Sequence, residues 1–90
     1  MGLESIREVN KMFTLETKKL DLHGVKHEDV KRKVIRFIEG YWDTDKELEI
    51  MTGNSQRMRG LVIEVIEEYK LTYSIGRLYS TDTSRIITWV

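Results

Sequence analysis

The sequence predicts a small α/β domain: a two-layer sandwich in the order β-α-β-α-β-β, with a mixed four-stranded sheet and the helices on one face. Three observations lead to this fold class. Twice in succession, a short segment with alternating apolar residues is followed by a longer segment with apolar residues at helical spacing. Two further strand-like segments then end the chain without a helix between them. The first two strands alternate between apolar and polar residues, a pattern typical of a sheet that is covered on one face only.

The first strand is expected over residues 16–23, where Leu20 and Leu22 alternate with Asp21 and His23. Successive side chains of a strand point to opposite faces. The two leucines would therefore enter the core, while Asp21 and His23 would share the other face, where they are either ordinary polar alternation or a catalytic pair.

Two helices are expected, the first over residues 27–42 and the second from the turn at 53–55 to Tyr69. In both segments apolar residues recur in steps of three and four. These are Val30, Val34, Phe37, Ile38 and Tyr41 in the first, and Met58, Leu61, Val62, Val65, Ile66 and Tyr69 in the second. Residues 1–15 form an N-terminal extension whose apolar residues have near-helical spacing, so this extension could be helical.

The remaining strands are expected over residues 47–52, 72–79 and 85–90, with a turn over residues 80–84. A helix between two strands provides the long crossover that parallel neighbours require. The first two strands are therefore expected to be parallel, with both helices on the same face of the sheet.

Composition limits the possible function classes. The chain of 90 residues has fifteen basic and fifteen acidic residues, so its net charge is zero and any binding to nucleic acid requires a local basic patch. It has no cysteine, which fits a reducing compartment, and no apolar run that approaches the roughly 20 residues needed to span a bilayer. We therefore expect a cytoplasmic protein with no membrane partner.

Two polar turns follow the first two strands. Asp21, His23 and Gly24 end the first strand, and the sequence Thr52-Gly53-Asn54-Ser55 ends the second. If these strands are parallel, both turns lie at the sheet edge where open α/β sheets usually bind ligands. The convergence of the two turns predicts a binding or catalytic site there.

His23 is the residue with acid–base chemistry in this pattern. An imidazole with an ordinary pKa of about 6.5 is suited to proton transfer near neutrality, and Asp21 could orient the ring or raise its pKa. The alternative is that His23 bonds to the following turn and Asp21 is solvated. As a metal site the pair lacks an apparent third ligand, because His27 belongs to the start of the helix. We therefore expect no resident metal; the alternative is a divalent cofactor such as Mg²⁺.

The second turn has features that favour an anion. It opens a helix, so free backbone amides and the helix dipole point toward it. Arg57 and Arg59 lie in or near the first turn of that helix, where their charges oppose the dipole unless a phosphate is bound. The alternatives are that both arginines extend into water and that Ser55 only caps the helix.

The segments "LDLHG" at Leu20 to Gly24 and "LEIMTGNSQRM" at Leu48 to Met58 resemble the Smr domain, the small MutS-related family. The resemblance covers roughly residues 17 to 90, so we divide the chain into the extension 1–15 and an Smr-like domain over 16–90. The resemblance implies a fold like the C-terminal domain of translation initiation factor 3. It also implies nucleic-acid binding and, in many members, endonuclease activity, as nicking of DNA or cleavage of RNA.

Residue by residue, Asp21 and His23 match the D-x-H motif that the family links to cleavage. Thr52 and Gly53 match the start of a second motif, usually H-G-x-G. Here Thr52 replaces the histidine and Ser55 replaces the second glycine. The glycine-rich turn that usually precedes the last strand is also missing, and residues 80–85 take its place.

The sequence therefore leaves two main hypotheses. The first is an endonuclease that cleaves RNA, the favoured substrate, or nicks DNA, with Asp21 and His23 as the catalytic pair. The second is a non-catalytic module that binds nucleic acid, or a ribosomal or repair protein, through the same edge. The expected phosphate-binding residues are shared by both hypotheses: Gly24, Thr52, Gly53, Asn54, Ser55, Arg57 and Arg59. In either case we expect a larger assembly to recruit so small a domain.

Overall fold

The computed structural model describes residues 16–76 and 82–90. The expected N-terminal helix lies outside the described residues, as do the end of the third expected strand and part of the turn over 80–84. No helix in the described part of the chain is long and apolar enough to cross a membrane.

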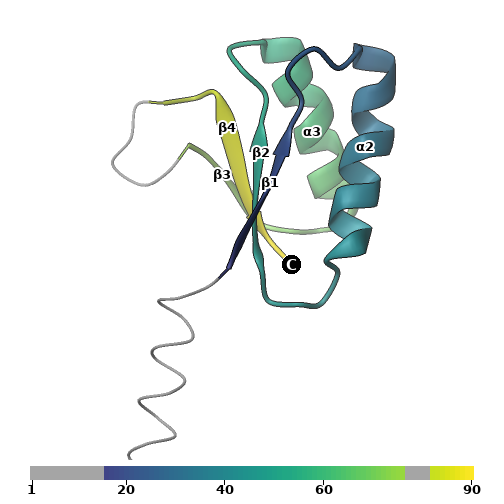
Figure 1. The fold of residues 1–90 in the computed structure, drawn as a ribbon, viewed down its shortest axis with the longest axis vertical. Coiled ribbons are helices and arrows are strands. Elements are labelled where there is room, and N and C mark those ends of the chain that lie inside the picture. Colours follow the sequence, from purple (N-terminus) through teal and green to yellow (C-terminus); the bar gives the residue numbers. More distant parts are fainter. Residues whose placement is uncertain (1–15, 77–81) are drawn as a thin grey trace, which may run out of the picture.

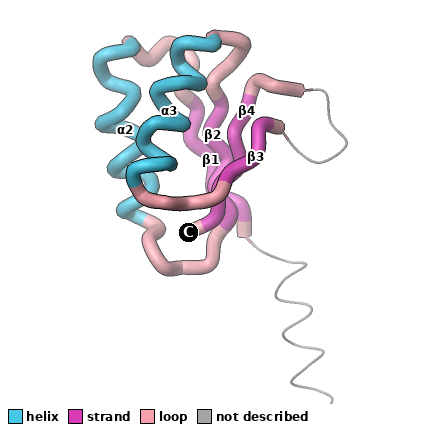
Figure 2. Tube along the Cα trace, turned by 180° about the vertical axis from the view of Figure 1, so that it is seen from behind, coloured by secondary structure: helices cyan, strands magenta, loops and turns pink. Residues whose placement is uncertain are grey.

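The observed element order is the predicted one. The elements are β1 (Thr17–Asp21), α2 (His27–Gly40), β2 (Glu47–Met51), α3 (Gln56–Glu68), β3 (Tyr73–Ile75) and β4 (Arg85–Trp89). They form a mixed four-stranded sheet in the order β1-β2-β4-β3, in which β1 and β2 are parallel and β4 runs antiparallel to both of its neighbours. Both helices lie on one face of this sheet (Figures 1 and 2), which confirms the two-layer arrangement.

The core lies between the sheet and the two helices. Its fully or largely buried side chains come from the predicted helical stripes and from alternate strand positions: Leu22, Val30, Val34, Ile38, Leu48, Ile50, Met58, Val62, Val65, Ile66 and Ile86. Burial of one such side chain stabilises the fold by about 1.5–3 kcal/mol. The periodic apolar positions therefore account for the attachment of both helices to the sheet.

Helix α2 ends at Gly40, two residues before the expected end. Just beyond it, Asp43 and Asp45 have positive φ angles of 60° and 58°, which a right-handed helix cannot include. Trp42 instead packs its ring against Tyr69, with ring centroids 5.4 Å apart. The helix therefore stops because the following backbone turns away toward β2.

In the described part of the expected span of 72–79, strand β3 covers Tyr73–Ile75. Gly76 follows it with a φ of +74°, and a Cβ atom at that position would overlap the backbone carbonyl oxygen of Asp82. The amide of Gly76 donates to the carbonyl of Arg85 at 2.8 Å. Gly76 thus lies directly against the residues that lead into β4, an approach that only glycine permits.

Candidate functional site

The two polar turns lie side by side at one edge of the sheet, as predicted. Asp21, the last residue of β1, is opposite Met51, the last residue of β2, and the amide of Leu22 donates to the carbonyl of Met51 at 3.0 Å. The amino ends of α2 and α3 lie at the same edge, at the top of Figure 1. The edge therefore combines two strand ends and two helix starts.

Strand β1 ends at Asp21, so His23 belongs to the turn and not to the strand. One oxygen of Asp21, Oδ1, accepts a hydrogen bond from the backbone amide of His23 at 2.8 Å. This is an Asx-type turn, in which a side chain replaces the missing strand partner of a backbone amide. The expectation that both side chains share a strand face is therefore wrong, because the aspartate itself bends the chain.

This turn leaves the side chain of His23 exposed to solvent. Both Asp21 and His23 are exposed, whereas Leu22 between them is completely buried and holds the turn against the core. Gly24 completes the turn with a φ of +77°, and the amide of Val25 donates to the carbonyl of Leu22 at 3.0 Å. Asp21 thus acts on His23 through the backbone and leaves the imidazole open to a ligand from solvent.

Helix α2 begins immediately after this turn. Lys26 precedes it and makes no side-chain capping bond, and His27 is its first residue, half-buried. His27 is therefore part of the helix start, as the sequence indicates, while His23 is the exposed imidazole of the edge.

The side chain and the amide of Thr52 form hydrogen bonds within the fold. It is 5% exposed, and its hydroxyl lies 3.0 Å from the carbonyl oxygen of Gly53 and 3.1 Å from that of Ser84, to either of which it donates. Its backbone amide also donates to the carbonyl of Ser84 at 2.8 Å. The side chain of Thr52 therefore stabilises the turn from inside the fold and is not exposed to a ligand.

The two residues that follow Thr52 in this turn are exposed to solvent. Gly53 and Asn54 are exposed, and Gly53 has a φ of +65°. Ser55 caps α3, because its hydroxyl accepts a hydrogen bond from the amide of Met58 at 3.1 Å. That capping role agrees with the sequence prediction and occupies the Ser55 oxygen.

The two arginines of α3 differ in their surroundings. Arg57 is exposed at the edge, whereas Arg59 is half-buried, and its Nε atom is buried without a hydrogen-bond partner among the described residues. A buried donor that is left unpaired costs about 1–3 kcal/mol. The two guanidinium groups therefore provide one freely exposed cation and one partly enclosed cation beside the α3 amino end.

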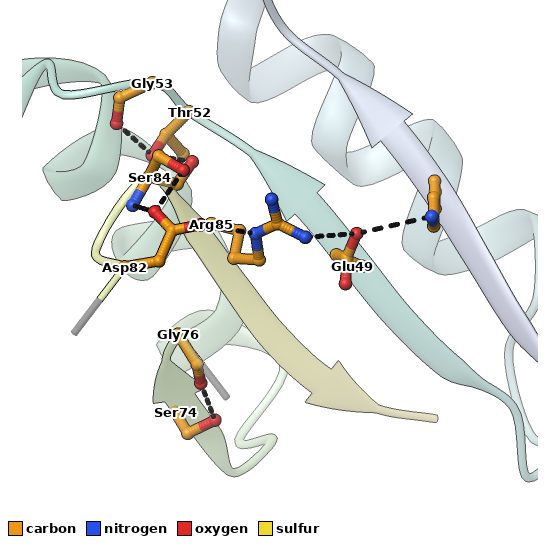
Figure 3. A network of polar contacts seen from close by, with 9 residues as sticks. Glu49, Thr52, Gly53, Ser74, Gly76, Asp82, Ser84 and Arg85 are labelled. Carbon is orange, nitrogen blue, oxygen red and sulfur yellow. Dashed lines mark hydrogen bonds and ion pairs between the residues drawn. The ribbon is translucent and has the colours of Figure 1, made fainter. Parts of the chain in front are cut away.

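A third segment, the residues just before β4, reaches this edge, and no sequence pattern indicates it as part of the site. The carbonyl of Ser84, just before β4, accepts hydrogen bonds from the amides of Thr52 and Gly53 at 2.8 and 3.0 Å, and from the hydroxyl of Thr52 in the network of Figure 3. In turn, one oxygen of Asp82 accepts hydrogen bonds from the amide and the hydroxyl of Ser84, at 2.9 and 2.5 Å. Asp82 and Ser84 thus attach the turn at Thr52 to Ser55 to the start of β4.

Arg85 extends this network onto the face of the sheet opposite the helices. Its Nε atom lies 3.1 Å from Asp82 in an ion pair without hydrogen-bond geometry, and its NH1 group donates to Glu49 at 3.3 Å (Figure 3). Glu49 is only 1% exposed and also lies 3.9 Å from the amino group of Lys19. The hydrogen bonds from the side chain and amide of Ser84, followed by the charge of Arg85, hold the pKa of Asp82 below its usual value.

The antiparallel pairing of β4 with β2 explains why this third segment lies at the edge. The amino end of an antiparallel strand lies beside the carboxyl end of its neighbour, so Ser84 and Arg85 must lie next to Thr52 once β4 pairs with β2. The sequence alone did not show which strand β4 pairs with.

Among the described residues, no group of three or more histidine, cysteine, aspartate or glutamate side chains could hold a metal ion. No family model matches the chain, and no curated protein or solved structure shows a significant similarity to it. The site is therefore interpreted from its own residues.

Proposed function

We propose that this chain is an Smr-like nucleic-acid-binding domain with endonuclease activity. The observation that carries the proposal is the presentation of His23 by an Asp21-stabilised turn, directly beside the open turn at Gly53 and Asn54. An exposed imidazole next to a helix start and a cation such as Arg57 combines acid–base chemistry with phosphate binding. The order β-α-β-α-β-β supports the likeness to the C-terminal domain of translation initiation factor 3 that the Smr resemblance implies.

In this proposal each residue has a defined task. His23 either accepts a proton from the hydroxyl or water that attacks the scissile phosphodiester or donates a proton to the leaving oxygen, and Asp21 orients it by holding its backbone amide. The amino end of α3 and Arg57 bind a phosphate next to the scissile bond. Structured RNA is the proposed substrate, and the cysteine-free composition supports a reducing compartment such as the cytoplasm.

A binding module without catalysis is the second candidate. The buried position of Thr52 favours it, because the hydroxyl at the place of the family's second histidine is directed into the fold. Such a module would bind RNA, or a ribosomal or repair partner, at the same edge without turnover.

A cleavage assay separates the two candidates. End-labelled structured RNA and supercoiled plasmid are incubated with the purified chain, with Mg²⁺ or with chelator, beside the variants His23→Ala and His27→Ala. The chain contains only these two histidines, so His27→Ala is a matched control for loss of an imidazole. The endonuclease predicts products that disappear with His23→Ala and persist with His27→Ala.

Cleavage that survives His23→Ala would refute the catalytic role. Binding of RNA at low salt without any products would favour the module. The chelator lane shows whether a metal ion takes part.

A further inference from the structure

The turn that opens α3 is held by hydrogen bonds to the segment before β4. A Cβ atom added at Gly53 would meet no atom of the described chain within 4 Å beyond its own neighbours, and both Gly53 and Asn54 are exposed. Side-chain packing therefore contributes little to the conformation of these two residues. Glycine also adopts several backbone conformations at similar cost, of which the φ of +65° at Gly53 is one. The group that selects this conformation is the carbonyl of Ser84, which accepts from the amides of Thr52 and Gly53.

The same hydrogen bonds decide which amides remain for a ligand. The Ser84 carbonyl occupies the amides of Thr52 and Gly53, and the next amide with a partner is that of Met58. The amides at 54–57 donate to no group within residues 16–76 and 82–90. They lie at the amino end of α3, where free amides and the helix dipole favour a phosphate. The bonds to Ser84 therefore leave a continuous set of free donors on this turn.

The side chain of Asp82 fixes the position of Ser84. Its Oδ1 atom accepts hydrogen bonds from the amide and the hydroxyl of Ser84, at 2.9 and 2.5 Å, so one oxygen holds both the backbone and the side chain of that residue. Its second oxygen lies 3.1 Å from the Nε atom of Arg85, which also donates from NH1 to the buried Glu49. Figure 3 shows these contacts in sequence, from Glu49 to the turn. The carboxylate of Asp82 is therefore held at both of its oxygens.

The backbone of Asp82 is held as well. Gly76 lies so close to it that a Cβ atom on Gly76 would overlap the carbonyl oxygen of Asp82, and the amide of Gly76 donates to the carbonyl of Arg85 at 2.8 Å. Asp82 thus connects the turn before α3 to the ends of β3 and β4. Because both strands belong to the sheet, the turn is positioned relative to the sheet through this one residue and Ser84.

We propose that Asp82 is a positioning residue of the candidate site: through Ser84 it holds the turn at Gly53 in the conformation that binds a phosphate of the nucleic acid. This inference rests on the proposed function and adds to it a residue that does not itself contact the ligand. His23 lies in a separate turn, which Asp21 stabilises. Asp82 is therefore expected to change the affinity for the substrate and not the proton transfer by His23.

The test compares Asp82→Ala with Asp82→Asn in the full chain. Alanine removes the oxygen that holds the amide and the hydroxyl of Ser84. Asparagine keeps an acceptor oxygen for both groups and loses the charge that faces Arg85. Thr44→Ala is the control, because it removes a hydroxyl that donates to the carbonyl of Tyr41 in the loop before β2, at the opposite end of the sheet. The Tm of each variant, measured by circular dichroism, shows whether it is folded at the assay temperature.

Amide hydrogen exchange in the free chain measures the conformation of the turn without any nucleic acid. We expect faster exchange of the amides of Thr52 and Gly53 in Asp82→Ala, and the exchange of the unmodified chain in Asp82→Asn and Thr44→Ala. If the released turn has the binding conformation for about a tenth of the time, the affinity of Asp82→Ala for RNA falls about tenfold, because the apparent Kd is divided by that fraction. The rate of single-turnover cleavage at saturating protein is expected to stay unchanged in all three variants.

Unchanged exchange at Thr52 and Gly53 in Asp82→Ala would overturn the positioning role and leave His23-dependent cleavage, and so the proposed function, intact. An equal loss of RNA affinity in Asp82→Ala and Asp82→Asn would also overturn it, because the charge of Asp82 would then matter and not its bonds to Ser84. The same holds for an equal loss in Thr44→Ala, which would indicate a general effect of stability. Absence of RNA binding by the unmodified chain would overturn both the inference and the proposed function.

Discussion

Replacing Thr52 with valine separates a structural role of its hydroxyl from a ligand-binding role. The hydroxyl is buried and donates to the carbonyl of Ser84 or of Gly53, at 3.1 or 3.0 Å. Valine preserves the shape of the side chain and removes the donor. The carbonyl of Ser84 keeps its two bonds from the amides of Thr52 and Gly53, so no buried acceptor is left unpaired.

The expected loss is therefore that of one ordinary hydrogen bond, about 1 kcal/mol in the free energy of unfolding. For a domain of this size, this corresponds to a decrease of about 4–8 °C in Tm. Circular dichroism during thermal and urea unfolding measures the change. RNA affinity and the rate of cleavage should remain within about twofold of the unmodified chain, because each tenfold loss of affinity would require about 1.4 kcal/mol of lost contact with the ligand.

Thr52→Ser is the matched control, since it keeps the hydroxyl and loses the methyl group. A structural role of the hydroxyl is refuted if Thr52→Val has an unchanged Tm and loses tenfold or more in RNA affinity while Thr52→Ser retains that affinity. That result would mean that the hydroxyl contacts the nucleic acid and not the backbone of Ser84.

Three further predictions concern the turns around the site. Gly53→Ala should destabilise the fold by about 1–2 kcal/mol, because alanine is strained at a positive φ. Gly76→Ala should destabilise it more, because its Cβ would also overlap the carbonyl of Asp82. Urea unfolding should therefore show a lower midpoint for Gly76→Ala than for Gly53→Ala. Ser55→Ala should cost about 1 kcal/mol by removing the cap of α3, whereas Ser55→Asp should restore most of the stability, and equal stability of all three chains would contradict the capping role. Hydrogen bonds from Lys18 and then Lys46 lower the pKa of Glu16 from 4.5 to about 2, so its contribution to stability is complete above about pH 4.5 and is lost as the pH falls from there toward 2. Glu16→Gln should flatten the pH dependence of Tm in that window, and an unchanged profile would show that the ion pairs do not form in solution.

The sequence by itself determined the element order and the core. Val30, Val34 and Ile38, or Met58, Val62 and Val65, repeat with the period of a helix, and a period of this kind can be satisfied only by burial of one side. It also determined that the turns after β1 and β2 meet, because a crossover helix makes these strands parallel.

Only the tertiary structure decided how the site is assembled. The end of β1 depends on a hydrogen bond between the side chain of Asp21 and the backbone of His23, which competes with the strand and has no periodic signature. The burial of Thr52 and the position of Arg85 depend on the pairing of β4 with β2, a contact between segments that are more than thirty residues apart. Local periodicity reports which face of an element is buried, whereas long-range pairing sets which polar groups are used inside the fold and which, like His23, remain open to a ligand.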